Sequence, residues 1–322
     1  MNLLVLSEHD VRRLLDMESC IEAMEEVLSA LARGELYQPL RFVGRPADAT
    51  SLIGLMPAHR AGEAPAWALK EIVVTPDNPT RGLDAHQGAV LLHDGVTGQL
   101  VAVLNASPVT ETRTAAVSAV ATRALARSDA ERVAILGAGV QAKAHVHAMR
   151  AVLEDPEIRI WARNLDAAER LAAEVEAVVA PSPDAALFGA EVVCATTSAK
   201  EPIVEHRWFA SGAHVNAVGS SIPTTRELDT ETVAASSLFV DRRESTLNEA
   251  GDYLIPAAEG AIGPDHIKAE LGEVLVGTHP GRESDDELTV FKSLGLAIED
   301  LASAELVVRR AREQGIGSEV EF

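Results

Sequence analysis

The chain has 322 residues, of which 47% are apolar, and a formal net charge of −21. This length exceeds that of one ordinary domain and predicts two. The acidic balance argues against a nucleic-acid partner, because phosphates are bound by clusters of Lys and Arg that we do not find in the sequence. No stretch approaches the ~20 consecutive apolar residues of a membrane span, and residues 1–12 lack the layout of a signal peptide. We therefore expect a soluble, cytoplasmic protein that does not contact a membrane.

The first third of the chain predicts helices followed by an antiparallel sheet. Ser7 and Asp10 have the spacing of a helix N-cap, and apolar residues recur at helical spacing from Ile21 to Leu31 before Gly34 ends the helix. Short apolar runs bounded by turn signals then follow, at 51–56, 66–74, 89–92 and 100–104. Their spacing predicts antiparallel strands without intervening helices.

A glycine-rich turn follows near the middle of the chain. The apolar run 133–136 is typical of a buried parallel strand and leads directly into Gly137-Ala138-Gly139-Val140-Gln141-Ala142. In this pattern Gly137 permits a tight turn, Gly139 lets backbone N–H groups approach a phosphate, and the small Ala142 lets the next helix pack on the strand. The pattern predicts a site for a dinucleotide pyrophosphate at the start of that helix. The alternative is a glycine turn with a structural role alone.

Strands and helices alternate around this turn. A helix is expected at 110–126 before it, and a last helix at 293–314. Between them, strands are expected at 133–136, 158–161, 191–195, 214–218 and 237–240, with helices at 141–153 and 165–177. This alternation predicts an α/β fold with a doubly wound parallel sheet.

The cysteines and histidines give no indication of a metal site. Cys20 and Cys194 lie far apart in apolar segments without metal-binding spacing, so we expect buried free thiols. The histidines form no HxxxH or HExxH pattern, and no metal is expected.

The end of the second parallel strand bears on the choice of cofactor. In dinucleotide-binding folds an acidic residue at this point binds the ribose hydroxyls of NAD, whereas an arginine favours the 2′-phosphate of NADP. This chain has Arg163 and Asn164 there and no carboxylate. We therefore expect NADP(H). NAD(H) remains possible if Arg163 is only a solvated loop residue and Asp166 binds the ribose.

Four charged residues are candidates for substrate chemistry, although their positions alone leave alternatives open. Lys70 interrupts an apolar run, so it either reaches the edge of the sheet or points into a site. The spacing does not decide the roles of Arg41 and of Arg113, which is expected at a helix start. Asp229 has the sequence context of a helix N-cap.

Seven segments, taken together, resemble the ornithine cyclodeaminase/mu-crystallin family. They occur in the family's order and at similar spacing, and the resemblance covers essentially the whole chain. The segments are Tyr37-Gln38-Pro39-Leu40-Arg41, Ala85-His86-Gln87, Thr110-Glu111-Thr112-Arg113-Thr114-Ala115-Ala116, the glycine turn 137–142, Arg226-Glu227-Leu228-Asp229, Glu270-Leu271-Gly272-Glu273-Val274 and Thr289-Val290-Phe291-Lys292-Ser293-Leu294-Gly295.

The resemblance implies a homodimer built from two domains in each chain. Residues 1–112 and 302–322 would form an α+β domain for substrate binding and dimerisation, and residues 113–301 an inserted Rossmann domain. Arg41, Lys70 and Arg113 would bind the substrate carboxylate, and Asp229 and Lys70 would be the catalytic residues. The residues that match cofactor-contacting positions are His86, Arg113, Thr114, Gly137, Gly139, Val140, Gln141, Arg163, Asn164, Val218, Gly219 and Ser293.

The implied reaction is hydride exchange between a nicotinamide and the carbon that bears an amino or imino nitrogen next to a carboxylate. Cations fix the carboxylate, and an acid such as Asp229 supplies the proton at nitrogen. We expect NAD(P)H-dependent reduction of a small α-imino acid, reversible as oxidation of an α-amino acid. The alternatives are cyclodeamination of ornithine to proline with NAD, and binding of NADPH and a small ligand without turnover, as in mu-crystallin-like members.

Two departures from the family pattern weaken the transfer of ornithine specificity. Asn105-Ala106-Ser107 stands where Asp-Gly-Asn is more usual, before the helix that carries Arg113. Met56 falls where some cyclodeaminases have a substrate-facing glutamate.

Overall fold

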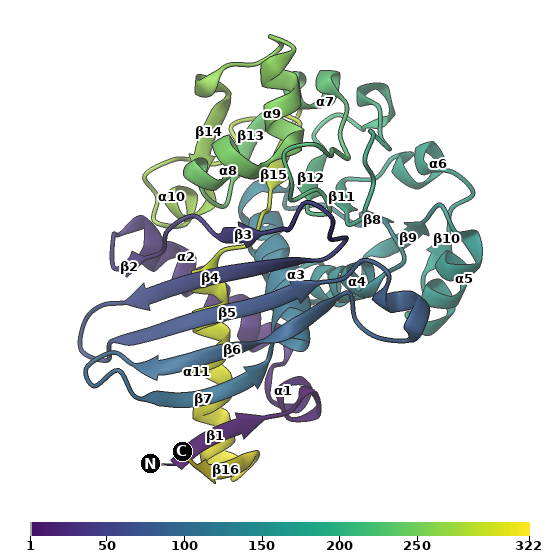
Figure 1. Cartoon of the computed structure of the whole chain (residues 1–322). Coiled ribbons are helices and arrows are strands. Elements are labelled where there is room, and N and C mark those ends of the chain that lie inside the picture. The colour runs from purple at the N-terminus through teal and green to yellow at the C-terminus, as the bar shows by residue number, and fades with distance from the viewer. Residues whose placement is uncertain (1) are drawn as a thin grey trace. The chain divides into compact units, whose positions relative to one another are not determined.

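The computed structural model describes residues 2–322, apart from the side chain of Pro79, and the chain divides into two compact units (Figure 1). Unit 1 contains the chain up to Arg113 together with Gly295–Phe322, and unit 2 contains Thr114–Leu294. The limits predicted from the sequence, at 112/113 and 301/302, stay a prediction, since compactness does not measure independent folding.

Unit 1 contains a sheet of mostly antiparallel strands. The strand order is β16-β1-β7-β6-β5-β4-β2, and β3 also pairs with β4. The pairs from β4 to β7 are antiparallel, which confirms the prediction for this part of the chain, whereas β1 and β7 are parallel. The strands are β1 (Asn2–Leu6), β2 (Leu36–Tyr37), β3 (Phe42–Gly44), β4 (Leu52–Arg60), β5 (Ala66–Val74), β6 (His86–Asp94), β7 (Leu100–Asn105) and β16 (Ser318–Glu321).

One face of this sheet is covered by helices. The long helix α11 (Ala297–Gln314) packs on β4, β5 and β6 and against α2 (Met17–Ala32). Alternation along β5 directs Ala68 and Lys70 to the buried face and leaves Trp67 and Val73 exposed on the other. The other helices of unit 1 are α1 (Glu8–Leu14), which has the predicted N-cap at Ser7 as part of a capping box with Asp10, and the short η1 (Asn78–Arg81).

Unit 2 contains a parallel sheet in the order β10-β9-β8-β11-β12-β15-β13-β14. From β8 the chain runs outward through β9 and β10 on one side, and then returns to β11 and β12 on the other. This is the doubly wound arrangement, and it places a topological switch point between β8 and β11. The strands are β8 (Arg132–Leu136), β9 (Glu157–Trp161), β10 (Val178–Val179), β11 (Val192–Ala195), β12 (His214–Ala217), β13 (Ser237–Val240), β14 (Ile267–Glu270) and β15 (Thr289–Lys292).

Helices connect these strands, and apolar side chains from both kinds of element form the core of unit 2. The helices are α3 (Ala106–Leu125), within which the boundary between the units falls, α4 (Val140–Val152), α5 (Leu165–Glu174), α6 (Pro183–Leu187), η2 (His206–Trp208), α7 (Thr230–Ala235), α8 (Arg243–Glu249), α9 (Gly251–Ala258), η3 (Pro264–His266) and α10 (Leu271–Leu275). The predicted fold class, a Rossmann sheet inserted into the chain of an α+β unit, is confirmed.

Two helix starts differ from the sequence prediction. Helix α3 begins at Ala106 instead of residue 110, because Asn105 Oδ1 accepts a hydrogen bond from Ser107 N, and Pro108 has no N–H that would need an acceptor in the first turn. Arg113 therefore lies in the body of α3 and not at its start. Helix α11 begins at Ala297 instead of residue 293, because the preceding segment is strand β15 and the turn after it. Among residues 2–322, no helix combines the length and the hydropathy of a membrane span.

Candidate functional site

The glycine turn joins β8 to α4 at the switch point of unit 2. Gly137 has a φ of +128°, and a Cβ atom there would lie 2.7 Å from Thr196 Oγ1. Its N–H donates to Trp161 O at 2.8 Å, so neighbouring strands hold the turn on both sides. Gly139 is the N-cap of α4, and a Cβ atom there would meet no atom within 4 Å. The first glycine is therefore required by the fold, whereas the second borders open space.

The first turn of α4 has the properties of an anion site. Its residues from Val140 to Lys143 include no carboxylate, and the first N–H groups of a helix have no intrahelical acceptor. His145 fixes this turn, since its ring lies 2.7 Å from Gln141 O and 2.9 Å from Ser118 Oγ of α3. Burial lowers the His145 pKa to about 4, so the ring is neutral. It ties α4 to the helix that carries Thr114.

The end of β9 places Arg163 and Asn164 at the same edge of the sheet. Trp161 pairs with Leu136, the residue before the glycine turn. Asn164 is the N-cap of α5, and its Oδ1 accepts a hydrogen bond from Ala167 N at 3.2 Å. Arg163 is exposed. Since the amide oxygen of Asn164 serves the helix, Arg163 is the better placed of the two to meet a ligand.

The ends of β11, β12 and β15 bring further predicted residues to this edge. Val218 N and Gly219 N both donate to Ala195 O, at 2.9 and 3.1 Å. Ser293 N donates to Ala217 O at 3.0 Å. The Ser293 hydroxyl is buried and has no hydrogen-bond partner among the described residues. Buried hydroxyls without a partner are uncommon, and a ligand group bound here would supply the missing hydrogen bond to Ser293.

Unit 1 contains a buried cluster of charged side chains. Lys70 Nζ lies 2.7 Å from Asp300 Oδ2, and Arg113 Nη1 lies 2.7 Å from Glu299 Oε2. Arg113 Nε is also 3.3 Å from Asp300 Oδ1. Both acids belong to the first turn of α11, where carboxylates are favoured by the helix dipole. Sequence reasoning missed Glu299 and Asp300; the available signal was a pair of adjacent acids between the apolar residues Ile298 and Leu301.

The pKa values of Lys70 and Arg113 are shifted in opposite directions. Burial lowers the Lys70 pKa to about 8, against the opposing effect of Asp300. Burial alone would lower the pKa of Arg113, but Asp300 and Glu299 outweigh it and raise the value. Arg113 therefore stays charged, and Lys70 is close to titration above neutral pH.

Arg41 and the loop around it are tied to the start of α11. Arg41 Nη2 donates to Gly295 O at 3.0 Å, and Gln38 Oε1 accepts from Ile298 N at 3.0 Å. Gly295 has a φ of +78°, and a Cβ atom there would clash with the Arg113 guanidinium. The structure thus brings Arg41, Lys70 and Arg113 to one place in unit 1, next to Glu299 and Asp300.

Two further positions singled out in the sequence lie on strands of unit 1. Met56 of β4 pairs directly with Lys70 of β5 and is buried, so the two side chains share the helix-covered face. His86 begins β6, its ring is exposed, and its carbonyl accepts a hydrogen bond from Ser107 Oγ at 3.0 Å.

Asp229 is the N-cap of α7, as its sequence context indicated. Its Oδ1 accepts from Thr232 N at 2.8 Å and its Oδ2 from His206 N at 3.3 Å. The side chain is half-buried. Capping accounts for this geometry, so a catalytic role for Asp229 stays a prediction.

The cysteines are buried free thiols, as predicted, and burial raises the pKa of both Cys20 and Cys194 to about 12. Within residues 2–322 there is no group of three or more His, Cys, Asp or Glu side chains arranged to hold a metal ion.

The switch-point glycine turn and the parallel sheet define a dinucleotide-binding protein of the Rossmann class. The chain belongs to the ornithine cyclodeaminase/mu-crystallin family, whose model matches residues 1–315. The resemblance inferred from the seven segments is therefore confirmed.

Relatives of known identity match almost the whole chain. Ketimine reductase mu-crystallin of Mus musculus is 39% identical over 292 residues, which cover 89% of this chain and 90% of that protein. The structure of Thermococcus litoralis Δ1-pyrroline-2-carboxylate reductase in complex with NADH and L-proline is 36% identical, with a TM-score of 0.94, covering 99% of this chain and 100% of the other. An archaeal alanine dehydrogenase dimer with bound NAD is 31% identical, also with a TM-score of 0.94, over 100% of both chains. These relatives are reductases and a dehydrogenase, in agreement with the enzyme predicted from the sequence.

Proposed function

We propose that this protein is an NAD(P)H-dependent reductase of small α-imino acids, which in reverse oxidises the corresponding α-amino acids. The observation that carries the proposal is the buried charged cluster of unit 1. In this cluster Lys70 and Arg113 are held by Asp300 and Glu299, and the half-buried Arg41 donates to Gly295 O at the start of the same helix. Fixed cations gathered in one place favour an anionic ligand such as a substrate carboxylate.

The cluster also favours one particular part of the substrate. Arg113 presents a rigid guanidinium that Glu299 and Asp300 hold in place, and Lys70 is held by Asp300. Fixed cations of this kind orient a carboxylate, so the adjacent C=N carbon is presented in one direction. Met56 opposite Lys70 supplies no second carboxylate that would bind the distal amino group of ornithine. This favours an imino acid over ornithine.

Unit 2 fits a nicotinamide dinucleotide. The open space at Gly139 and the start of α4 would hold the pyrophosphate, and Ser293 would use its buried hydroxyl. When bound, the reduced nicotinamide supplies the hydride. The relatives' structures contain NADH and NAD, and we propose NADP(H) for this chain because Arg163 follows β9 where NAD-binding proteins have an acid.

Reduction of a C=N bond also requires a proton at nitrogen. We assign its delivery to Asp229, whose two oxygens are fixed by Thr232 N and His206 N. The Lys70 ammonium remains bound to the substrate carboxylate in this scheme and neutralises it.

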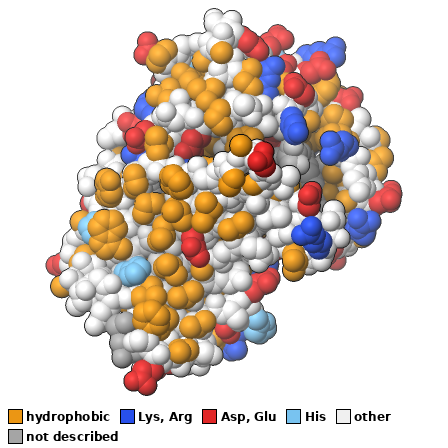
Figure 2. Space-filling model, viewed as in Figure 1, with side chains coloured by type: hydrophobic (Ala, Val, Ile, Leu, Met, Phe, Trp, Pro, Cys, Tyr) orange, Lys and Arg blue, Asp and Glu red, His pale blue; other side chains and the backbone are white. Residues whose placement is uncertain are grey.

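A second copy of the chain is proposed as the partner of unit 1. The sheet face opposite α11 carries hydrophobic side chains over β4 to β7, and Figure 2 shows them gathered on one side of unit 1. They include Ile53, Trp67 and Val73, which are 38%, 41% and 43% exposed. An apolar sheet face of this kind is typical of a protein interface, and the archaeal relative is a dimer.

Enzyme assays separate the candidate functions. Purified protein is incubated with Δ1-pyrroline-2-carboxylate and NADPH or NADH, and in parallel with ornithine and NAD. We expect nicotinamide oxidation with the imino acid and little ammonia from ornithine, and we expect Asp229→Asn to abolish reduction while retaining NADPH affinity. Proline and ammonia from ornithine, without turnover of the imino acid, would show a cyclodeaminase. Tight NADPH binding without turnover of either substrate would show a binding protein.

A further inference from the structure

A buried glutamate lies at the edge of the unit 2 sheet and has no role in the reaction described above. Glu227 is 0% exposed. Its Oε1 accepts hydrogen bonds from Thr197 N at 2.6 Å and Thr197 Oγ1 at 2.7 Å, and its Oε2 accepts from Gly219 N at 2.7 Å. Thr197 follows β11 and Gly219 follows β12, so one carboxylate binds the ends of two adjacent strands. We call the Glu227 carboxylate with Thr197 and Gly219 the clasp.

The two loops that Glu227 joins are in close contact. A Cβ atom on Gly219 would collide with Thr197 O and with the Glu227 carboxylate. Because both loops donate to the same Glu227 carboxylate, outward movement of either loop would break hydrogen bonds to Glu227. The clasp fixes the backbone at Val218 and Gly219, both of which match cofactor-contacting positions.

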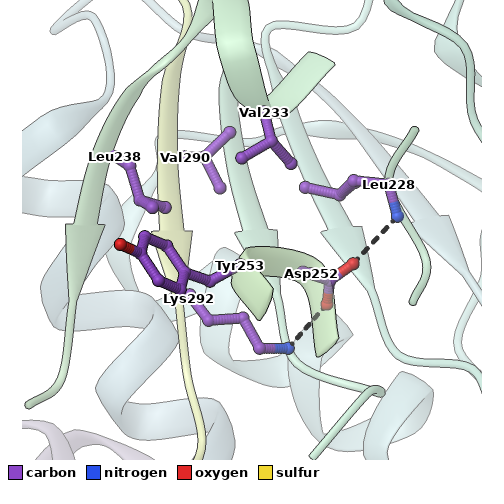
Figure 3. Close-up of a pocket in the computed structure, with 7 residues that line it drawn as sticks. All are labelled: Leu228, Val233, Leu238, Asp252, Tyr253, Val290 and Lys292. Atoms are coloured by element: carbon purple, nitrogen blue, oxygen red, sulfur yellow. Dashed lines mark hydrogen bonds and ion pairs between the residues drawn. The ribbon is translucent and has the colours of Figure 1, made fainter. Parts of the chain in front are cut away.

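A second buried carboxylate fixes the backbone at Glu227. Asp252 of α9 accepts hydrogen bonds from Glu227 N at 2.8 Å and Leu228 N at 3.0 Å. Its other oxygen lies 2.9 Å from Lys292 Nζ, and Figure 3 shows the contacts of Asp252 with Leu228 and Lys292. Lys292 ends β15, immediately before Ser293. The figure shows Lys292 and Asp252 meeting beside a small, largely apolar cavity lined by Leu228, Val233 and Tyr253. The network thus links the ends of β11, β12 and β15.

These strand ends lie on the side of the switch point away from Arg163. If the adenosine half of the dinucleotide extends over β9, the nicotinamide half extends over β11 and β12. We propose that Glu227 is a positioning residue that shapes these strand ends for the nicotinamide half of the cofactor. The proposal rests on the dinucleotide binding described above, and it assigns Glu227 no contact with the cofactor.

The charge of the clasp depends on pH near neutrality. Burial and the neighbouring Asp252 raise the Glu227 pKa to about 7, while Lys292 and the hydrogen bonds from Thr197 oppose the shift. Protonation turns one oxygen of Glu227 into a hydroxyl, which is a weaker acceptor for the N–H groups of Thr197 and Gly219 than a carboxylate oxygen. As the pH falls below about 7, the hydrogen bonds of the clasp weaken, and affinity for the complete cofactor should fall with them.

The test is a titration of the full-length protein with NADPH, followed by nicotinamide fluorescence at several pH values. For the wild type, the dissociation constant should rise roughly tenfold from about pH 8 to about pH 6. Glu227→Gln turns an NH₂ group toward one donor and carries no charge, so it should bind NADPH roughly tenfold more weakly at pH 8, with little pH dependence. Glu154→Gln, in the exposed loop after α4, is the matched control and should follow the wild type.

A second ligand separates positioning from general destabilisation. 2′-Phospho-ADP-ribose lacks the nicotinamide ring, and Glu227→Gln should bind it as tightly as the wild type does. Thr197→Val removes one donor to Glu227 and leaves the carboxylate in place, so it provides the same test if Glu227→Gln does not fold. Equal weakening for both ligands, or wild-type pH dependence of NADPH binding in Glu227→Gln, would overturn the proposal. Wild-type protein that binds neither NADPH nor NADH would instead refute the proposed function, and the clasp with it.

Discussion

Two neighbouring glycines in the turn between β8 and α4 should respond in opposite ways to the same substitution. Gly139→Ala adds a methyl group where no protein atom lies within 4 Å, at an ordinary φ of −94°. The fold should accept this methyl group. Alanine restricts the unfolded chain but is a poorer N-cap than glycine, and these effects oppose each other, so the free energy of unfolding should change by less than about 1 kcal/mol.

The same methyl group would occupy the space through which a pyrophosphate approaches the N–H groups of α4. Loss of one hydrogen bond to a charged group costs about 1.5–3 kcal/mol. The dissociation constant for NADPH should therefore rise roughly 10- to 150-fold. Fluorescence titration measures this affinity, and thermal unfolding without ligand measures the stability.

Gly137→Ala is the matched comparison within the turn. At a φ of +128°, with the new Cβ atom 2.7 Å from Thr196 Oγ1, the substitution should cost about 1–3 kcal/mol of folding free energy. The Tm should fall by roughly 2–4 °C for each kcal/mol. Wild-type affinity for NADPH in Gly139→Ala, or an equal loss of stability in both variants, would refute the assignment of this turn.

The remaining predictions concern two charged side chains, one glycine and the apolar sheet face. Since burial lowers the Lys70 pKa to about 8, the lysine loses its charge above that pH, and KM for an imino acid should rise about tenfold per pH unit there, as measured by initial rates. Gly295→Ala should displace the Arg113 guanidinium and raise the same KM at least roughly tenfold in the same initial-rate assay. Arg163→Asp should weaken NADPH roughly tenfold or more and leave NADH affinity equal or improved. Trp67→Glu places a charge on the apolar sheet face and should convert the proposed dimer to monomer in sedimentation velocity.

Three of these tests have a control within the chain. Lys70→Arg keeps its charge, so the pH dependence of KM should disappear; if it persists, Lys70 is not its source. Arg170→Asp, exposed on α5, should leave the cofactor preference unchanged. Val96→Glu, 78% exposed in the turn between β6 and β7, should leave the oligomer intact. A monomeric wild-type protein would contradict the proposed interface.

Much of the unit 2 sheet was predictable because its buried strands leave uninterrupted apolar runs. Strands β8 and β11 have this signature, whereas Arg159 interrupts β9 and Asn216 interrupts β12, and the glycine turn fixes where β8 ends. Strand β10 has only two residues, and β14 and β15 include Lys268 and Lys292. Such short or charged strands form through pairing with neighbours already in place, which local pattern does not reveal.

The candidate site was predictable only in part. Lys70 was conspicuous because a charge in an apolar strand requires a partner, but the sequence did not name the partner. Asp300 lies 230 positions along the chain, and only the packing of α11 on β5 brings the two together. Glu227 gave no separate signal in the sequence, where Asp229, two residues further on, matched a family position. Its burial and its three hydrogen bonds became evident only when the ends of β11 and β12 were placed.

Direct hydride transfer to the imine carbon is the central claim about this protein. The most direct measurement uses NADPH deuterated at the transferable position of the nicotinamide ring, with Δ1-pyrroline-2-carboxylate as substrate and mass spectrometry of the product. We predict proline that carries one deuterium at its α-carbon, formed in proportion to the NADPH consumed. Absence of proline, or proline without deuterium, would contradict the claim.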